Sequence, residues 1–183
     1  IHGIKLTITN LNKNTLQPDL RLLDVLATMG CEVEKTNSSI SIRGPEHLKG
    51  GFSVSLGDFS DQALTLGCIA PYADAPIEIK DVGHIRKHEC DRLEALAVGL
   101  NKLGIKTESS FSTIKIYPAK LTPASIDTFH DHRVAMSFAI LGSKCPGVEI
   151  SNPSCVAKTF PSFFEDMEQV GIKLKHELRA GLV

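Results

Sequence analysis

The chain has 183 residues, 42% of them hydrophobic and 22% charged, which is the balance of an ordinary soluble globular protein. This length is enough for one domain, or two small ones, with a hydrophobic core. The formal net charge is −1, which excludes a global basic field, so we expect neither nucleic acid nor a membrane as a partner. Any anion-binding surface must therefore be local and created by folding.

The cysteines are odd in number and scattered without a C-x-x-C pair: Cys31, Cys68, Cys90, Cys145 and Cys155. Several stand in apolar runs, where a free thiol behaves as a small hydrophobic side chain. We expect no disulfide framework and a reducing, cytoplasmic location. We also expect no signal peptide, and no apolar run reaches the roughly 18–20 residues of a transmembrane helix.

The first elements in chain order are a strand at Leu6–Thr9 and an amphipathic helix from about Leu23 to Gly30. A glycine at this place ends a helix in the left-handed conformation without a Cβ penalty. Extended residues follow, and Ser39–Arg43 alternates as a second strand across a polar turn. No buried helix precedes this unit, so we expect it to belong to a larger architecture.

The next segment begins after a loop at 44–51 with a helix at Ser60–Ala70 that is apolar nearly all round, which predicts burial. A turn leads from it to the strand Ile77–Lys80. The helix–glycine–strand pattern then returns, with apolar residues in helical spacing from Leu93 to Leu103, followed by Gly104. A strand follows it directly, and Thr113–Tyr117 is a second strand across a turn.

A third copy follows a loop at 119–125. A second apolar helix is predicted at His130–Leu141, then a strand at Val148–Ser151. The last amphipathic helix has apolar residues at Phe160, Phe163, Phe164, Met167 and Val170, with Gly171 and a short strand after it.

The repeated order is strand, buried helix, strand, amphipathic helix, strand, strand. It predicts an α/β fold, a pseudo-symmetric domain of repeated βαβαββ units with buried central helices. We assign residues 1–177 to this single domain and residues 178–183 to a tail.

Cations stand where predicted helices begin: Arg92, Arg133 and Lys158. Free backbone N–H groups and the helix dipole favour an anion there, so the three together favour a site for a small phosphate or carboxylate. The alternative for Arg133 is a solvated side chain beside a capping Asp131. From these residues alone both interpretations remain open.

Carboxylates and histidines accompany these cations. One of Glu89 and Asp91 is expected to cap the helix beginning near Arg92, and the other could donate or accept a proton. His88 is either a further ligand for a phosphate or hydroxyl group or a plain surface histidine.

Asp61 precedes the first buried helix much as Asp131 precedes the second, so both should lie at one end of the domain. Either Ser60 or Asp61 caps that helix, or Asp61 positions a substrate hydroxyl and takes its proton. His84 and His88 are four apart without a third ligand at helical spacing, so we expect no metal site. The common nucleotide-binding glycine motifs are missing, and the expected chemistry is acid–base and electrostatic, without a cofactor.

At these residues the sequence resembles the 3-phosphoshikimate 1-carboxyvinyltransferase (EPSP synthase) family. The likeness extends from about Gly3 to Lys173 and is carried by four motifs: Ser60-Asp-Gln-Ala-Leu-Thr65, His88-Glu-Cys-Asp-Arg92, Asp131-His-Arg-Val-Ala-Met136 and Ala157-Lys-Thr-Phe-Pro161. The resemblance implies the C-terminal half of an enzyme in which two like domains, each of three βαβαββ units, close over the substrates. That enzyme transfers the enolpyruvyl group of phosphoenolpyruvate to the 5-hydroxyl of shikimate 3-phosphate, through a tetrahedral intermediate.

The resemblance also implies roles for individual residues. Asp61 matches the base that binds the shikimate ring, and Glu89 the acid–base group that protonates the phosphoenolpyruvate methylene. The cations that hold phosphoenolpyruvate, or its competitor glyphosate, match Arg92, Arg133 and Lys158. The positions of His88 and His84, which contact shikimate 3-phosphate, are more often lysine and asparagine in the family.

The partners so implied are the two substrates and the N-terminal half of the same enzyme, which supplies most of the shikimate 3-phosphate pocket; we expect a monomer. This chain alone is expected to be an inactive half-site. Two alternatives are a UDP-N-acetylglucosamine enolpyruvyl transferase-like enzyme, disfavoured by the Asp131-His-Arg133 and Lys158-Thr-Phe-Pro161 segments, and a non-catalytic domain that binds an anion or a partner protein.

Overall fold

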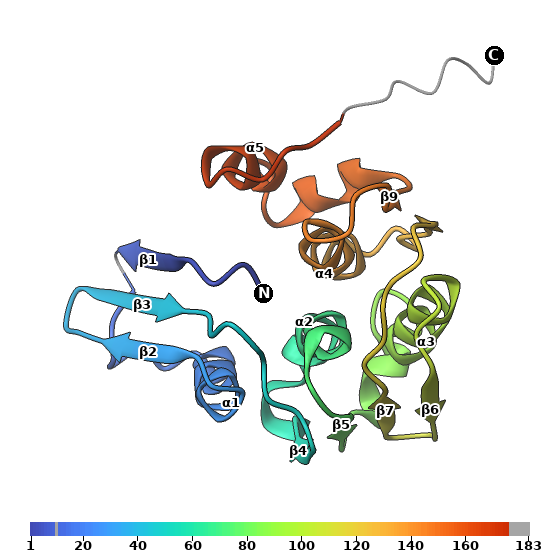
Figure 1. The fold of residues 1–183 in the computed structure, drawn as a ribbon, viewed down its shortest axis with the longest axis horizontal. Coiled ribbons are helices and arrows are strands. Elements are labelled where there is room, and N and C mark those ends of the chain that lie inside the picture. Colours follow the sequence, from blue (N-terminus) through green and yellow to red (C-terminus); the bar gives the residue numbers. More distant parts are fainter. Residues whose placement is uncertain (10, 176–183) are drawn as a thin grey trace.

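The computed structural model describes residues 1–9 and 11–175, arranged as short strands around packed helices (Figure 1). The expected tail at 178–183, and residues 176–177 of the expected domain, lie outside the described residues. None of the helices within the described ranges is long and apolar enough to cross a membrane.

One βαβαββ unit is complete and occupies the middle of the chain. Its elements are β4 (Phe52–Ser55), α2 (Ala63–Ile69), β5 (Ile77–Lys80), α3 (Arg92–Lys102), β6 (Thr107–Ser109) and β7 (Ile114–Ile116), with short 3-10 helices η2 (Gly57–Gln62), η3 (Ala70–Tyr72) and η4 (Gly83–Lys87). The strands form a four-stranded sheet in the order β4-β5-β7-β6. β4 and β5 are parallel, because the helix α2 connects them, whereas the β6–β7 hairpin is antiparallel.

The two flanking units contain only parts of this pattern. The first has β1 (Lys5–Thr9), η1 (Pro18–Arg21), α1 (Leu22–Thr28), β2 (Glu32–Lys35) and β3 (Ser39–Arg43), in an antiparallel sheet of order β1-β3-β2. The last has β8 (Ser125–Ile126), α4 (His132–Gly142), β9 (Glu149–Ile150), η5 (Pro153–Lys158) and α5 (Phe163–Gln169), in which β8 and β9 pair in parallel. The predicted α/β class with repeated units is confirmed.

Three glycines end the amphipathic helices as predicted. Gly30, Gly104 and Gly171 have φ values of 94°, 80° and 94°, the left-handed region that glycine adopts without strain. Strands β2 and β6 follow the first two within a few residues. No strand is assigned after Gly171 in the described residues that remain, up to residue 175.

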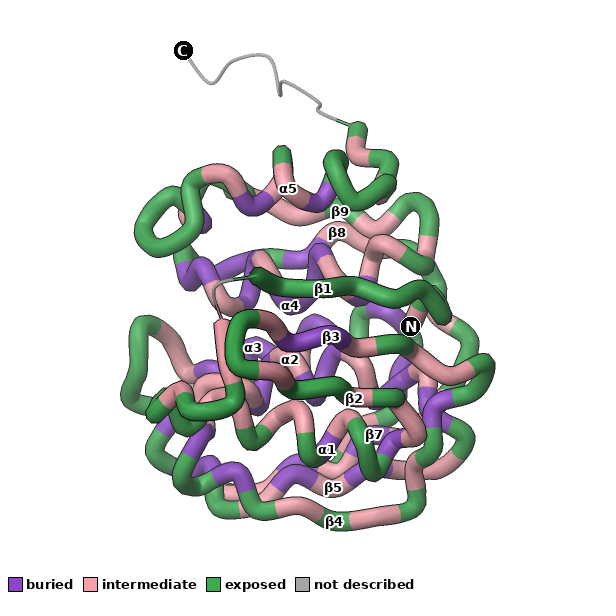
Figure 2. The backbone as a smooth tube through the Cα atoms, turned by 90° about the vertical axis from the view of Figure 1, so that its left-hand side faces the viewer, coloured by how far each residue is buried: buried purple, intermediate pink, exposed green. Residues whose placement is uncertain are grey.

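The helices α2 and α4 lie inside the molecule, which confirms the prediction of buried central helices (Figure 2). Glycines let the helices approach closely. A Cβ at Gly67 of α2 would overlap Leu96 of α3, and a Cβ at Gly99 of α3 would overlap the ring of Phe138 of α4. Close packing of this kind holds α2, α3 and α4 in fixed positions, and the N-termini of α3 and α4 carry the candidate site residues.

The last amphipathic helix begins later than predicted. Helix α5 starts at Phe163, and Phe160 lies outside it with an exposed side chain, as does Val170 beyond its end. The physical reason is Pro161, because the residue before a proline is sterically pushed away from the helical region. The helical spacing of Phe163, Phe164 and Met167 is retained, and Phe163 and Met167 are buried against α4 and η5.

Candidate functional site

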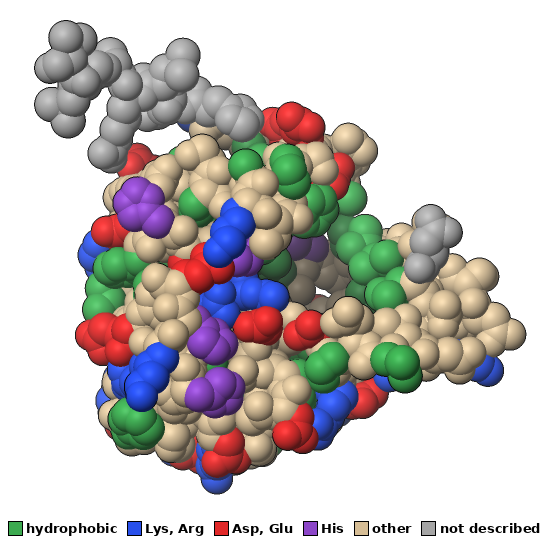
Figure 3. Space-filling model, turned by 180° about the vertical axis from the view of Figure 1, so that it is seen from behind, with side chains coloured by type: hydrophobic (Ala, Val, Ile, Leu, Met, Phe, Trp, Pro, Cys, Tyr) green, Lys and Arg blue, Asp and Glu red, His purple; other side chains and the backbone are tan. Residues whose placement is uncertain are grey.

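The predicted site residues gather on one face of the molecule, where charged side chains and two histidines lie beside a hollow (Figure 3). They come from four segments that are far apart in the sequence: the 3-10 helix η2, the stretch from η4 to the first residue of α3, the N-terminus of α4, and the end of η5. Folding therefore brings all of the predicted residues together.

Arg92 is the central cation of this cluster. It is the first residue of α3, and Asp91 caps that helix by accepting a hydrogen bond from the Glu94 amide at 2.9 Å. The Arg92 side chain points inward and only 4% of the residue is exposed. Its Nε donates to Asp131 Oδ2 at 2.8 Å and its Nη1 donates to Asp61 Oδ1 at 2.9 Å. Arg92 thus bonds to two carboxylates that belong to different units, Asp61 and Asp131.

Asp131 is fully buried and performs two tasks. As the N-cap of α4, it accepts hydrogen bonds from the Arg133 amide at 2.8 Å and the Val134 amide at 3.4 Å. It also accepts from Arg92. Burial by itself would raise the pKa of Asp131, but the Arg92 hydrogen bond and charge and the two amides lower it below its ordinary value. Asp131 is therefore a carboxylate whose role is to hold Arg92 and the start of α4.

The backbone before Asp131 is strained. Phe129 and His130 have φ values of 50° and 57°, a region that residues with a Cβ rarely adopt. The Phe129 amide donates to Asp127 Oδ1 at 2.8 Å, and the His130 ring contacts Asn152 Nδ2 at 2.8 Å. These bonds stabilise the unusual turn that delivers Asp131 to the helix start.

Asp61 faces Arg92 from the other side of the cluster. It lies within η2, and α2 begins at Ala63 after Gln62, without any side-chain cap, so neither Ser60 nor Asp61 caps that helix. Since it does not cap the helix, Asp61 accepts a hydrogen bond from Arg92 through Oδ1 and forms an ion pair through Oδ2 with Arg133 Nη2 at 2.8 Å. The prediction that Asp61 and Asp131 lie at one end of the domain is confirmed, because Arg92 bonds to both.

Glu89 bridges two groups of the last unit. Its Oε1 accepts from Lys158 Nζ at 2.5 Å and its Oε2 from His132 Nδ1 at 3.1 Å. Partial burial by itself would raise the pKa of Glu89, but the Lys158 hydrogen bond and the neighbouring His132 lower it below its ordinary value. At rest Glu89 is therefore a carboxylate.

Lys158 does not open a helix, contrary to the prediction. It is the last residue of η5 and precedes α5 by several residues, because Pro153 starts a short helix of its own before Pro161 interrupts the chain. Its side chain is 60% exposed. The cation nevertheless lies in the cluster, since η5 packs against α4.

His132 was not assigned a role from the sequence, although it stands between two residues that were. It is 4% exposed and lies in the first turn of α4, directly beside Glu89. The feature of the sequence that could have identified His132 is its position directly after the capping Asp131, at the start of an otherwise apolar helix.

His88 and His84 lie side by side, with ring centroids 5.9 Å apart. His88 Nδ1 accepts from Arg92 Nη1 at 2.9 Å, so that nitrogen carries no proton. Burial and the positive charge of Arg92 lower the pKa of His88, in agreement with a neutral ring. His84 Nε2 contacts Ser60 Oγ at 2.7 Å, which joins it to η2. Both histidines thus flank Asp61.

A metal ion is a further possibility to consider at this site. Ligand atoms of Glu89, Asp131 and His132 lie within 4.8 Å of one another. Both carboxylates already accept hydrogen bonds from cationic side chains, Lys158 and Arg92. A divalent cation would have to displace them, so we assign these groups to ion pairs.

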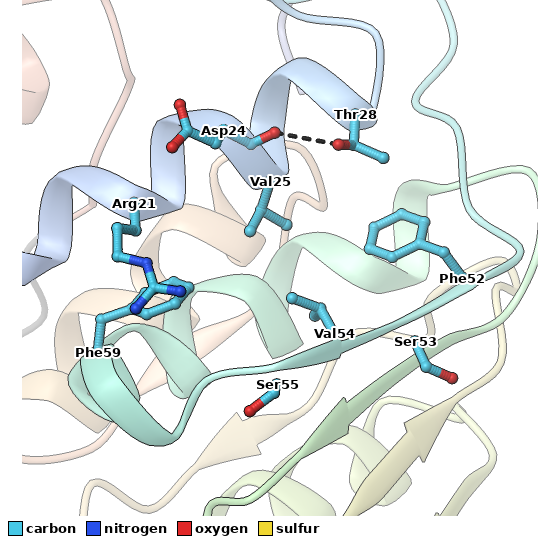
Figure 4. Close-up of a pocket in the computed structure, with 9 residues that line it drawn as sticks. All are labelled: Arg21, Asp24, Val25, Thr28, Phe52, Ser53, Val54, Ser55 and Phe59. Carbon is cyan, nitrogen blue, oxygen red and sulfur yellow. Dashed lines mark hydrogen bonds between the residues drawn. The ribbon is translucent and has the colours of Figure 1, made fainter.

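A second hollow lies elsewhere, between α1 and the free side of β4, with a volume of about 340 Å³ (Figure 4). It contains none of the predicted site residues. Its cation, Arg21, stacks on Phe59 and pairs with Asp58 at 2.7 Å. We assign it no chemistry.

The cluster contains three cations paired with three carboxylates, and the cations differ in their exposure to solvent. Arg92 is buried and bonded to both Asp131 and Asp61, whereas Arg133 and Lys158 keep 29% and 60% of their side chains exposed. An anion entering from solvent can replace Asp61 as the partner of Arg133 or Glu89 as the partner of Lys158. The arrangement can therefore bind an anion and hold two carboxylates beside it for proton transfer.

Comparison with known proteins points to one family. The family model described as EPSP synthase (3-phosphoshikimate 1-carboxyvinyltransferase) matches residues 1–167. The 3-phosphoshikimate 1-carboxyvinyltransferase 2 of Halalkalibacterium halodurans is 44% identical over 175 residues, covering 94% of this chain and 39% of that protein. The chloroplastic 3-phosphoshikimate 1-carboxyvinyltransferase of Brassica napus is 36% identical, covering 93% and 34%.

Solved structures agree in fold. An EPSP synthase from Acinetobacter baumannii superimposes with a TM-score of 0.83 at 24% identity, covering 94% of this chain and 43% of that one. The enolpyruvyl transferase NikO from Streptomyces tendae gives a TM-score of 0.73 at 18% identity, with 94% and 40% covered. The chain spans about two-fifths of the length of the relatives it matches. By its sequence, this chain belongs to the EPSP synthase family.

Proposed function

We propose that this chain supplies one half of the active site of an enzyme that transfers the enolpyruvyl group of phosphoenolpyruvate to the 5-hydroxyl of shikimate 3-phosphate. The observation that carries the proposal is the ion-pair network in which Arg92 and Arg133 bond to Asp61 while Lys158 bonds to Glu89. Family membership supports the same activity. The remainder of the site, including most of the shikimate 3-phosphate pocket, belongs to another part of a longer polypeptide that works as a cytoplasmic monomer.

Phosphoenolpyruvate binds through the two accessible cations. Its phosphate and carboxylate groups replace Asp61 and Glu89 as the partners of Arg133 and Lys158. These hydrogen bonds are strong because both partners are charged. Arg92 stays bonded to Asp131 and contributes positive potential from beneath. The same cations stabilise charge as phosphate leaves.

Asp61 and Glu89 then divide the proton transfers. Asp61 takes the proton of the 5-hydroxyl, whose oxygen attacks C2 of phosphoenolpyruvate, while Glu89 gives a proton to C3 to form the tetrahedral intermediate. In the second step C3 returns a proton to Glu89, the C2–C3 double bond re-forms, and the C2–O bond to phosphate breaks with its electrons on phosphate.

Glu89 must be protonated to act first as an acid, whereas at rest Lys158 keeps its pKa low. Movement of Lys158 to the substrate removes that cause, so substrate binding itself prepares the proton donor. His132 remains bonded to the other oxygen and fixes the carboxyl orientation. His88 and His84, on the far side of Asp61, contact the shikimate 3-phosphate.

The test is phosphate release from phosphoenolpyruvate by the longer polypeptide, with shikimate 3-phosphate or UDP-N-acetylglucosamine as acceptor. We expect turnover with the first acceptor, inhibition by glyphosate, and about 10²–10⁴-fold lower turnover for Asp61→Asn and Glu89→Gln at nearly unchanged stability. Asp58→Asn is the matched control, because Asp58 shares η2 with Asp61 but pairs with Arg21, which lies outside the cluster. Turnover near the wild-type value in either site variant would refute its assigned role.

A further inference from the structure

The charges of the candidate site balance one another in this structure. Three cations and three carboxylates form it: Arg92, Arg133, Lys158, Asp61, Asp131 and Glu89. A phosphate monoester that also carries a carboxylate, such as phosphoenolpyruvate, brings about two and a half to three negative charges at neutral pH. An anion of this kind therefore makes the site negative, and a negative surrounding favours the protonated form of a nearby titratable group.

His88 is well placed to take up such a proton, because histidine changes its charge between about pH 5 and pH 8. Its Nδ1 accepts a hydrogen bond from Arg92 Nη1 at 2.9 Å, which requires an unprotonated Nδ1. The same atom lies 4.0 Å from Asp61 Oδ1, and 32% of the His88 side chain is exposed, so solvent can supply the proton. His88 therefore stands between a cation to which it is bonded and a carboxylate that lies just beyond hydrogen-bond distance.

Groups on each of the elements around His88 decide its charge. Burial and the positive charge of Arg92, on α3, disfavour a protonated ring most, and His84, on η4, acts in the same direction. Asp61, on η2, and Asp131, on α4, favour protonation. The pKa of His88 is lowered below its ordinary value because burial and Arg92 outweigh the two carboxylates. In this arrangement the ring is neutral at pH 7.

Anion binding at Arg133 changes this balance. Arg133 Nη2 pairs with Asp61 Oδ2 at 2.8 Å, so an anion that replaces Asp61 there leaves this carboxylate with one cation fewer. The charge of Asp61 and the charges of the anion then both favour a proton on the His88 ring. Once protonated, Nδ1 is a donor and can no longer accept from Arg92. It can instead donate to Asp61 when their 4.0 Å separation shortens to about 2.8 Å.

We propose that His88 takes up a proton from solvent as the anion binds and so becomes a further cation of the site, paired with Asp61. The opposite ring nitrogen, Nε2, carries a hydrogen in both forms, so it can donate to shikimate 3-phosphate throughout. The inference rests on the proposed function for the identity of the anion, phosphoenolpyruvate. It adds that the affinity of this site for the anion depends on pH through one residue.

The direction of the pH dependence follows from linkage. Anion binding raises the pKa of His88, so the gain in affinity is full below the pKa of the anion-free protein and is lost as pH rises through the pKa of the bound form. The measurement is the KM for phosphoenolpyruvate of the longer polypeptide at about pH 6 and about pH 8.5, for wild type and for His88→Gln.

The glutamine of this variant stays neutral and can also accept from Arg92. Phosphoenolpyruvate and Glu89 titrate in both proteins, so the ratio of the two KM values isolates His88. We expect the ratio of the variant KM to the wild-type KM to be about fivefold or more higher at the lower pH. A ratio that does not change with pH, with phosphoenolpyruvate turnover intact, would refute this inference and leave the proposed function standing.

Two further variants test whether His88 is the group that titrates. His88→Lys keeps its positive charge up to about pH 10, so the ratio of its KM to that of His88→Gln should stay constant between the two pH values. His84→Gln is the matched control, because His84 lies beside His88 with ring centroids 5.9 Å apart, while its Nε2 contacts Ser60. It should keep the wild-type pH dependence. A wild-type pH dependence in His88→Lys would assign the titration to another group and overturn the proposal.

The ring nitrogens of His88 report the proton directly, independently of turnover. NMR signals of these nitrogens, assigned by their loss in His88→Gln, give the midpoint of the ring titration with and without phosphoenolpyruvate. We expect saturating phosphoenolpyruvate to raise this midpoint by about one pH unit. An unchanged midpoint would overturn the proton uptake, whether or not the enzyme turns over. A raised midpoint in a protein that does not transfer the enolpyruvyl group would support the proton uptake and refute the proposed function.

Discussion

Arg92 and Asp131 form a buried ion pair that joins the N-termini of α3 and α4. The Nε–Oδ2 distance is 2.8 Å, and the two residues are 4% and 0% exposed. Each is also anchored to its own helix, Arg92 as the first residue of α3 and Asp131 as the cap of α4. The pair therefore fixes the relative position of the two helix ends that carry Glu89, His132 and Arg133.

The first prediction concerns this pair. Asp131→Asn removes one of the two carboxylates that compensate the buried Arg92 and leaves the ion pair with Asp61 in place. The loss of a hydrogen bond between charged groups costs about 1.5–3 kcal/mol. We expect a loss of this size in the free energy of unfolding, measured by urea denaturation. Asp58→Asn breaks an exposed pair with Arg21 and should cost about 1 kcal/mol or less. Similar losses in the two variants would show that the buried pair contributes no more to the free energy of unfolding than the exposed pair.

The second prediction concerns helix packing. Alanine usually stabilises a helix by about 1 kcal/mol relative to glycine. At Gly99, however, the new Cβ overlaps the Phe138 ring, so Gly99→Ala should instead destabilise by about 1–3 kcal/mol. Lys102→Ala, on the exposed side of the same helix, should be near neutral. Thermal unfolding of both variants measures the difference, and a stabilised Gly99→Ala protein would contradict the close approach of α3 and α4.

The third prediction concerns acid stability. A group whose pKa is lowered in the folded state binds protons more readily when unfolded, so its contribution is full above the unfolded pKa and declines as pH falls toward the folded pKa. His88 has a lowered pKa, so stability should begin to fall below about pH 6.5. Glu89 and Asp131, also lowered, should steepen the fall below about pH 4.

The measurement is the urea midpoint as a function of pH for wild type and His88→Gln. We expect the variant to lose part of the slope just below about pH 6.5, since burial also lowers the pKa of His2, and to keep the steeper fall at lower pH. His47→Gln is the control, because His47 is fully exposed beside Glu46. An unchanged slope in His88→Gln would mean that another group titrates there.

The fourth prediction concerns the loop that carries His88 and Glu89. Arg86 donates to Asp91 at 2.8 Å and to the carbonyls of Phe111 at 2.9 Å and Ser110 at 2.8 Å, so it fastens the loop to the helix cap and to the β6–β7 hairpin. Arg86→Ala should cost about 1.5–3 kcal/mol, the range for hydrogen bonds to charged groups.

Hydrogen exchange locates this effect. In Arg86→Ala we expect faster exchange at the first amides of α3 and at the Ser110–Thr113 turn, with β1–β3 unchanged. Arg43→Ala is the control, since Arg43 is an exposed residue of β3 that pairs with Glu32 at the long distance of 3.8 Å. Uniformly faster exchange along the chain would indicate global destabilisation in place of a local release.

Much of the fold could be predicted from local physical chemistry. Apolar periodicity identified α3, an apolar surface nearly all round identified α2 and α4 as buried, and glycines at 30, 104 and 171 marked three helix ends. The motifs also carried the family resemblance that the comparisons confirmed. These features depend on neighbours within a few residues, and such local preferences can be read from the chain.

The exact starts and caps of the helices could not be read in this way. Lys158 was expected at the start of the last helix and Phe160 within it, but α5 begins only at Phe163, after Pro161. Asp61 and Glu89 each precede a helix start, yet only geometry shows that Gln62 precedes α2 without a side-chain cap and that Asp91, not Glu89, caps α3. Small backbone shifts decide such caps.

The sequence by itself determined which side chains are present and that cations accompany carboxylates near helix starts. Tertiary structure decided how they pair: Arg92 turned inward to Asp131, while Arg133 and Lys158 stayed accessible. The physical reason is the cost of desolvation, since a charged side chain is buried only where another segment supplies a partner of opposite charge. Asp131 lies 39 residues from Arg92 along the chain, and Glu89 lies 69 residues from Lys158.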